Sequence, residues 1–264
     1  MRSDVGTRPT IVHLVRHGAP IGHRGDLGLT DLGRDQARAC GRELADQLDG
    51  PIIVTHSPRM LRETAAEILE ALVAGGSAAA WSPRRPDPGF DNFVVDAPGR
   101  RDEVTALYPM FRSASSATPP AAWVTELRRF WHVHDLGGDP IGHWLGGRWV
   151  SLEGPDHVLS RLWFSLAAQA GLVGPGGHVV ACTHSGALRA LVLGVTGRDP
   201  GEPDHARSID VRIDSTSPDV EEMTLVFDGV SWPVAAPRQA STRQWSSQEP
   251  RPATSSRRAP SASA

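Results

Sequence analysis

The sequence contains no lysine: all 27 of its basic residues other than histidine are arginines. A guanidinium group is a planar fork that binds phosphate or carboxylate through paired hydrogen bonds, so an anion site in this chain must use that geometry. With 30 acidic residues, the net charge is −3, which supplies no overall field for nucleic acid or an anionic membrane. We therefore expect neither nucleic-acid nor membrane partners.

Cysteine is almost absent too. Cys40 and Cys182 lie far apart without CxxC spacing, which argues against a disulfide framework and a structural zinc site. No apolar run approaches the length of a membrane span, and the first ten residues, "MRSDVGTRPT", lack the apolar segment of a secretion signal. We expect a cytoplasmic protein, with 264 residues sufficient for one large domain or two small ones.

The order of secondary-structure patterns predicts the fold class. Apolar, β-branched runs indicate strands, whereas apolar positions at helical spacing indicate helices. Alternating strands and helices imply parallel strands joined by helical crossovers. We therefore expect an α/β three-layer sandwich: a mostly parallel central sheet with helices on both faces. The expected strands are 10–15, 50–58 and 177–186, the helices 29–48, 59–76, 154–172 and 187–197, and later strands, at the sheet edge, 208–214 and 222–234.

Two segments depart from this alternation of strands and helices. Residues 77–150 are rich in Pro, Gly, Ser and Trp and contain one expected helix, at 121–134. We interpret the segment as a cap-like insertion over one end of the sheet, within a catalytic domain of residues 1–236. Residues 237–264 have almost no apolar side chains, and such a composition predicts a disordered tail.

Three expected strands end in basic side chains. "HLVRHG" ends on Arg16 and His17, "IIVTHSPR" carries His56 and Arg59, and "VVACTHSG" ends on His184. In an open parallel sheet, ligands bind beyond the carboxyl ends of the strands, where helix N-termini add N–H donors. Since such a cationic cluster is costly without a counter-charge, we expect an anion site at this edge.

Four ordered segments, "LVRHG", "LTDLGRDQA", "SPRMLRETAAEI" and "THSGALRAL", resemble the histidine phosphatase superfamily, which includes phosphoglycerate-mutase-like enzymes. The resemblance covers residues 10–75 and 150–197, and each segment lies at an expected strand-to-helix junction. It implies catalysis without a metal or cofactor, in which His17 attacks phosphorus and carries a transient phosphoryl group. The implied substrate is a small phosphorylated metabolite.

The resemblance also assigns the groups that bind the phosphoryl oxygens. Arg16, an arginine of the 59–62 stretch and His184 would offset the charge during transfer. We favour Arg59, which lies nearer the strand end, and keep Arg62 as the alternative. The further substrate-binding candidates are Gly18, His23, Arg62, Ser185 and Gly186.

The leaving oxygen needs a proton, and the family supplies it from a glutamate that this chain lacks in the equivalent region. Asp91 is the best positional candidate because Phe90 and Phe93 could desolvate it and raise its pKa. Asp96, Asp102 and Glu103 are the alternatives. Glu153, before the helix at 154–172, is expected either to brace the pocket or to cap that helix.

Other features leave alternatives open. "WHVHD", at 131–135, could suggest a metal site, but a helical context would make its two histidines diverge. Five of the eight tryptophans fall between 123 and 163, where they pack the insertion onto the sheet or form a lid over an apolar substrate.

We predict a metal-independent phosphatase acting on a small phosphomonoester through a phosphohistidine. A mutase is the first alternative, disfavoured by the short loop "APIGHRGDLGLT", in which Pro20 and His23 replace the family's common Thr and Asn. A non-catalytic phosphate-binding domain is the second.

Overall fold

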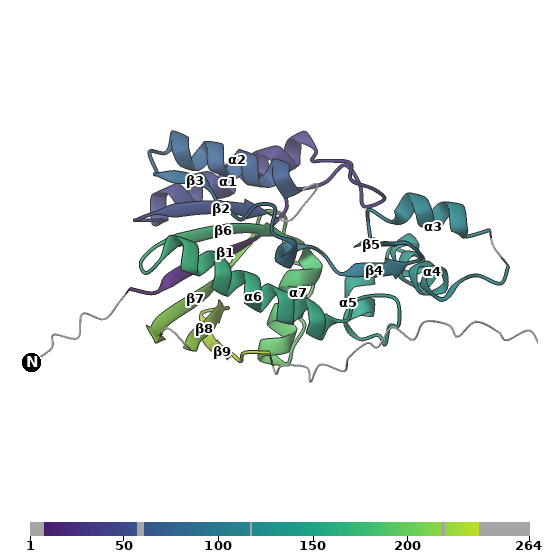
Figure 1. The fold of residues 1–264 in the computed structure, drawn as a ribbon. Coiled ribbons are helices and arrows are strands. Elements are labelled where there is room, and N and C mark those ends of the chain that lie inside the picture. The colour runs from purple at the N-terminus through teal and green to yellow at the C-terminus, as the bar shows by residue number, and fades with distance from the viewer. Residues whose placement is uncertain (1–7, 57–60, 117, 218–219, 238–264) are drawn as a thin grey trace, which may run out of the picture.

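The computed structural model describes residues 8–56, 61–116, 118–217 and 220–237. Within these ranges, seven strands form one sheet in the order β3-β2-β6-β1-β7-β8-β9 (Figure 1). The strands β3, β2, β6 and β1 are parallel, and β7, β8 and β9 continue the sheet in antiparallel pairing. The strand bounds are β1 Thr10–Arg16, β2 Ile52–His56, β3 Ala79–Trp81, β6 His178–Thr183, β7 Ser208–Ser217, β8 Val220–Phe227 and β9 Val230–Val234.

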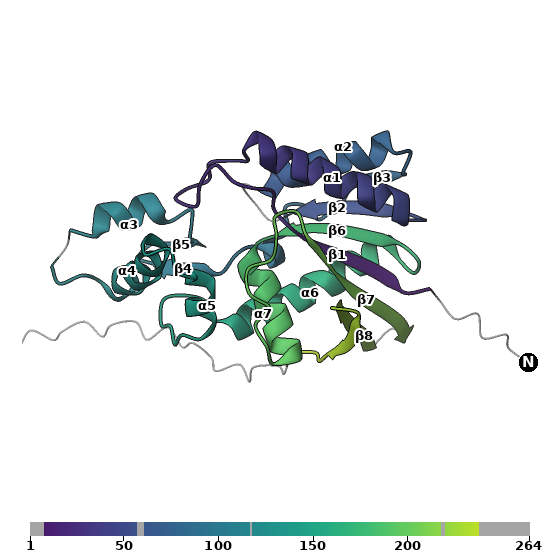
Figure 2. The same ribbon diagram turned by 180° about the vertical axis from the view of Figure 1, so that it is seen from behind.

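Helices cover both faces of this sheet (Figures 1 and 2). Helices α1 and α2 lie side by side on one face, and α6 and α7 lie on the other. This arrangement confirms the predicted α/β sandwich with a mostly parallel centre. The helix bounds are α1 Asp31–Gln47, α2 Leu61–Ala74, α6 Pro155–Val173 and α7 Ser185–Thr196.

The sequence of β6 explains its central place. All six of its residues are buried, and neighbouring side chains enter different cores. Val179 and Ala181 pack with α6 and α7, whereas Val180 and Cys182 pack with α1 and α2. A strand covered on both faces has a near-continuous apolar run, and the four central residues of β6, "VVAC", provide it.

The edges of the sheet differ from the predictions. Residues 79–81, expected within the insertion, instead form β3, which pairs with β2 at one edge. Strand β7, expected at an edge, lies between β1 and β8. The predicted strand 222–234 is two strands, because Asp228 and Gly229 adopt positive φ angles of 50° and 75° and turn the chain. Short strands and two-residue turns carry too little periodicity to be placed from sequence.

Five elements between β3 and α6 form a separate layer beyond the carboxyl ends of the parallel strands, hereafter the cap (Figures 1 and 2). The cap has its own apolar core, which continues onto the first turns of α6 and α7 through Val158, Ala187 and Ala190. Helix α4 matches the predicted helix 121–134, and the other cap elements have no clear sequence pattern. The bounds are β4 Val94–Ala97, β5 Arg100–Glu103, α3 Tyr108–Ala114, α4 Ala122–Asp135 and α5 Pro140–Leu145, preceded by the short 3₁₀ helix η1 Pro88–Phe90.

The predicted tail lies outside the described residues, except for Pro237. None of the described helices combines the length and the apolar character that a membrane span requires.

Candidate active site

Two histidines meet where β1 and β6 end. The parallel pairing places Arg16 opposite Thr183, so the next residues of both strands, His17 and His184, are neighbours. Their ring centroids lie 5.2 Å apart with the ring planes at 68°. On the other side of β6, the pairing puts His56, the last residue of β2, opposite Cys182. The structure therefore brings together the three strand ends that the sequence singled out.

The position of the proton on His17 follows from one hydrogen bond. Its Nδ1 lies 2.8 Å from the carbonyl oxygen of Gly18, which can only accept, so Nδ1 donates. In the neutral ring, Nε2 then carries the free electron pair. Burial lowers the pKa of His17 well below 6.5, and the neighbouring His184 and Arg16 add to this, against the raising effect of the Gly18 bond. His17 is consequently neutral at pH 7, with Nε2 available as a nucleophile.

Gly18 allows the loop after β1 to approach the start of α1. A Cβ atom at this position would lie 2.2 Å from the carbonyl oxygen of Gly33, in the first turn of that helix. The backbone N–H of Gly18 donates to Thr64 Oγ1 on α2, at 3.2 Å. His17 is thus held on a loop fixed against two helices.

Arg16 is buried beside His17. Its Nη2 forms an ion pair with Glu202 Oε1 at 2.5 Å, and its Nη1 donates to the carbonyl of Pro203. Burial lowers the pKa of Arg16, and the carboxylates of Glu202 and Asp204 oppose that effect. Its Nε has no hydrogen-bond partner within the described part of the chain. This N–H group is one donor that an incoming anion could satisfy.

His184 is buried at the N-terminus of α7. Its Nε2 lies 3.2 Å from Glu103 Oε1, without the geometry of a hydrogen bond. Ser185 and Gly186 follow in the first turn of α7, where unpaired backbone N–H groups and the helix dipole favour negative charge. A Cβ on Gly186 would lie 2.5 Å from Asn92 Oδ1, so this turn packs closely against the segment that leads into β4.

A cavity of 390 Å³ opens between this edge and the cap. Its sheet side contains the buried cationic and imidazole groups described above, and its cap side combines apolar and aromatic residues with Asn92, Thr105, His134 and Asp139. The lining residues used below are Arg16, His17, His23, Asn92, Val104, Phe130, Trp131, His134, Asp139, Pro140, Ile141, His184, Ser185 and Glu202.

The loop after β1 closes one flank of the cavity against the cap. The ring of His23 lies 5.8 Å from that of His134 on α4. Arg24 pairs with Asp135 and lies over the ring of Tyr108, 5.2 Å from its centroid. Burial and the neighbouring His134 lower the pKa of His23, which leaves its ring uncharged at pH 7. His23 therefore contacts the cap rather than the sheet side of the cavity.

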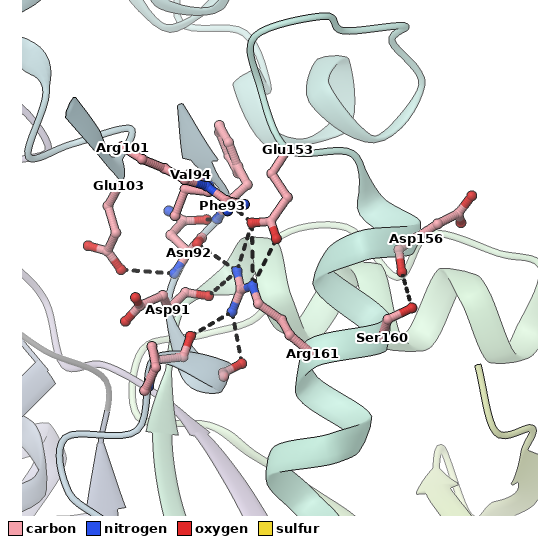
Figure 3. A network of polar contacts seen from close by, with 12 residues as sticks. Asp91, Asn92, Phe93, Val94, Arg101, Glu103, Glu153, Asp156, Ser160 and Arg161 are labelled. Carbon is pink, nitrogen blue, oxygen red and sulfur yellow. Dashed lines mark hydrogen bonds and ion pairs between the residues drawn. The ribbon is translucent and has the colours of Figure 1, made fainter. Parts of the chain in front are cut away.

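Arg161 on α6 holds the segment that leads into β4 (Figure 3). Its Nη2 donates to the carbonyls of Asp91 and Asn92 at 2.9 and 2.7 Å, and its Nε pairs with Glu153 Oε1 at 3.1 Å. Glu153 also accepts from the N–H of Val94. Glu153 was expected either to brace the pocket or to cap α6, and its bonds with Arg161 and Val94 correspond to bracing. The N-cap of α6 is Gly154, and no side chain forms a hydrogen bond there.

The expected acid, Asp91, is not among the residues that line the cavity, whereas its neighbour Asn92 is. In Figure 3, the Asp91 side chain points away from Arg161. Of the alternatives, Asp96 and Asp102 pair with Arg101 and Arg100 on the cap hairpin. Glu103 is buried, accepts from the N–H of Asn92 and contacts His184.

The described part of the structure places neither candidate arginine of the 59–62 stretch at the cavity. Arg59 lies outside the described residues. Arg62 is exposed in the first turn of α2 and does not line the cavity.

A network that the sequence did not indicate joins the cap to Arg16. Arg189 on α7 is fully buried, with Nη2 at 2.6 Å from both Asp139 Oδ2 and Asp199 Oδ2. Its Nη1 lies 3.2 Å from Glu202 Oε2. Burial lowers the pKa of Arg189, but its hydrogen bonds with Asp139 and Asp199 outweigh this and raise it. The sequence feature that accompanies this network is the charged loop "RDPGEPDHAR" after α7. The loop has no periodicity, so its contacts could not be predicted from the sequence.

His132 and His134 both lie on α4. In the described ranges, no group of three or more His, Cys, Asp or Glu side chains is placed to hold a metal ion.

Comparison with known families supports the interpretation of this site. A family model described as the histidine phosphatase superfamily (branch 1) matches residues 12–91. Over those residues, the chain is similar to the histidine phosphatase superfamily. The matched part contains the loop with His17 and the segment that ends at Asp91, which confirms the resemblance drawn from the sequence.

Solved structures share the fold seen here. Mycobacterial hydrolases 1 and 2 match with TM-scores of 0.53 and 0.52 and identities of 19% and 18%. The alignments cover 85% and 87% of this chain and 100% and 94% of those chains. A mycobacterial glucosyl-3-phosphoglycerate phosphatase in complex with VO3 matches with a TM-score of 0.50 and 17% identity, over 82% of this chain and 97% of that one. No curated protein matches the chain significantly.

Proposed function

We propose that this chain is a metal-independent phosphatase that hydrolyses a small-molecule phosphomonoester through a phosphohistidine at His17. The observation that carries the proposal is the state of that ring. His17 is buried and neutral, and its Nδ1 donates to Gly18, so the electron pair lies on Nε2. The match of residues 12–91 to the histidine phosphatase superfamily model and the fold shared with the phosphatase named above support the same reaction class.

In the first step, Nε2 of His17 attacks phosphorus; the N–P bond forms, and the bond from phosphorus to the ester oxygen breaks. Arg16 Nε and His184 Nε2, buried nitrogens that lack a hydrogen-bond partner in the described chain, would bind the phosphoryl oxygens. The N-terminus of α7, at Ser185, adds backbone N–H groups and the positive end of the helix dipole, which also favour the phosphoryl group. In the second step, water attacks phosphorus and gives a proton to the carboxylate that protonated the leaving oxygen; the N–P bond breaks, and phosphate leaves with His17 restored. Two displacements replace one difficult step.

The leaving oxygen takes a proton in the first step. We propose Asp91 for this role on its sequence position between Phe90 and Phe93, although the residue that lines the cavity is its neighbour Asn92. Glu103, in contact with His184, is the second candidate. We also propose Arg59 as a phosphate-binding residue, on the family resemblance alone.

The test is phosphate release from p-nitrophenyl phosphate in the presence of a chelator. Wild type should turn over, and His17→Ala should lose activity by at least about a thousandfold, the scale expected when a covalent nucleophile is removed. The matched control is His157→Ala, at an exposed histidine on α6, which should keep wild-type activity. Activity that survives in His17→Ala, or that chelation abolishes and zinc restores, would contradict the mechanism.

A further inference from the structure

The cap side of the cavity differs in chemistry from the sheet side. Val104, Phe130, Trp131, Pro140 and Ile141 line it. Phe130 and Trp131 belong to the apolar core of the cap and contact each other edge to face, with centroids 5.2 Å apart. An organic group that binds here therefore exchanges contact with water for contact with apolar and aromatic side chains.

Trp131 is fixed by its neighbours. The ring of Tyr108 lies 5.0 Å from it, and that of His134 lies 5.5 Å from it, both nearly perpendicular. A side chain held on several sides presents the same surface to every ligand, so little conformational entropy is lost on binding. This wall is preformed.

The carboxylates of the cavity are already bound to arginines. Asp139 accepts from Arg189 through both oxygens, at 2.8 and 2.6 Å. Glu202 pairs with Arg16 and with Arg189. Carboxylates accept hydrogen bonds from sugar hydroxyls, and here both already accept from arginines, which leaves fewer acceptor positions for a sugar.

We propose that this cavity takes phosphomonoesters of compact, apolar, ring-bearing alcohols or phenols in preference to sugar phosphates. The inference rests on the proposed function. The phosphoryl group would lie at Arg16, His17 and His184, and the organic group would lie against Phe130, Trp131 and Ile141 of the cap. A volume of 390 Å³ is near the lower end for small-molecule pockets, which fits one or two rings beside the phosphoryl group.

The contrast with a sugar phosphate follows from hydrogen bonding. Each sugar hydroxyl buried against an apolar wall without a partner lowers binding on the order of tenfold. A benzyl group has no such requirement and gains from losing contact with water. Affinity for the two classes should therefore differ even though both present the same phosphoryl group.

The test compares benzyl phosphate with glucose 6-phosphate. Both are esters of primary alcohols, so the basicity of the leaving oxygen is similar, and the ratio of kcat/KM reports on the organic group. We expect wild type to favour benzyl phosphate by at least about tenfold. Trp131→Ala should lower that ratio about tenfold, whereas Phe164→Ala, at an exposed aromatic residue on α6, should leave it unchanged.

Because Trp131 is part of the cap core, Ile141→Ser provides a second variant at a smaller side chain, expected to lower the ratio in the same direction. A binding measurement removes the need for turnover. Calorimetry on His17→Ala should show phenylphosphonate binding at least about tenfold more tightly than methylphosphonate.

The outcomes separate the two proposals. If glucose 6-phosphate is hydrolysed as well as or better than benzyl phosphate, and His17→Ala abolishes both activities, the substrate inference is overturned and the phosphohistidine mechanism stands. If hydrolysis survives in His17→Ala, the mechanism fails whatever the preference. If wild type hydrolyses neither ester, equal binding of the two phosphonates overturns the inference, and a preference for the phenyl compound supports it.

Discussion

The neutrality of His17 predicts a specific dependence of stability on pH. Burial, followed by the neighbouring His184, lowers the pKa of His17 well below its ordinary value of 6.5 in the folded chain. In the unfolded chain the ring titrates near 6.5, so below that pH the unfolded state binds a proton that the folded state does not. The contribution of His17 to the free energy of unfolding is thus present above pH 6.5 and decreases as the pH falls below 6.5.

For a His17 that stays neutral in the folded protein at both pH values, linkage gives a loss of about 1.4 kcal/mol between pH 7.5 and 5.5. The comparison is with His17→Gln, which cannot titrate. Other histidines whose pKa values are also lowered contribute to both proteins and largely cancel: His23, His178 and His205.

The assay is urea unfolding of both proteins from pH 5.5 to 9.0. The wild type should lose about 1.4 kcal/mol more than His17→Gln between pH 7.5 and 5.5, and the two curves should be parallel above pH 7.5. Parallel curves across the whole range would show that His17 has an ordinary pKa in the folded chain, and they would refute the neutral nucleophile.

Three further substitutions test individual contacts. Gly18→Ala places a Cβ 2.2 Å from the carbonyl oxygen of Gly33, and we expect a loss of about 3 kcal/mol and a Tm lower by about 6–12 °C; a wild-type melting curve would mean that the loop can move. Asp91→Asn should slow benzyl phosphate at least about a hundredfold more than p-nitrophenyl phosphate, whose leaving group needs no proton, and equal losses would remove Asp91 as the acid. Glu202→Gln removes a carboxylate that competes with phosphate for Arg16, so the inhibition constant of inorganic phosphate should fall about two- to tenfold; weaker inhibition would show instead that Glu202 orients the guanidinium.

The parts of the fold and site that follow buried, periodic sequence could be predicted. The runs "TIVHLV" and "HVVACT" are apolar because β1 and β6 are central, and parallel pairing then sets His17 beside His184 without further information. Thr30, a residue type favoured immediately before a helix, caps α1: its Oγ1 accepts from the N–H of Gly33 at 3.0 Å. In each case a local rule and the tertiary structure favour the same arrangement.

The parts that depend on long-range pairing could not be predicted. Arg189 is one arginine on an apolar helix, and only the folded chain brings Asp139, Asp199 and Glu202 to it from the cap and the loop after α7. Likewise, Arg161 donates from α6 to the carbonyls of Asp91 and Asn92, and the residue that lines the cavity is Asn92, one position after the acid expected from sequence.

The central claim is tested most directly by isolating the phosphorylated enzyme. Wild type mixed with an aryl phosphate is quenched rapidly in alkali, digested and mapped by mass spectrometry, with the ring nitrogen assigned by phosphorus NMR. We predict one phosphoryl group on Nε2 of His17, stable in alkali and lost in acid, and none on His17→Ala. A phosphoryl group on another residue, or none at any time during turnover, would contradict the account.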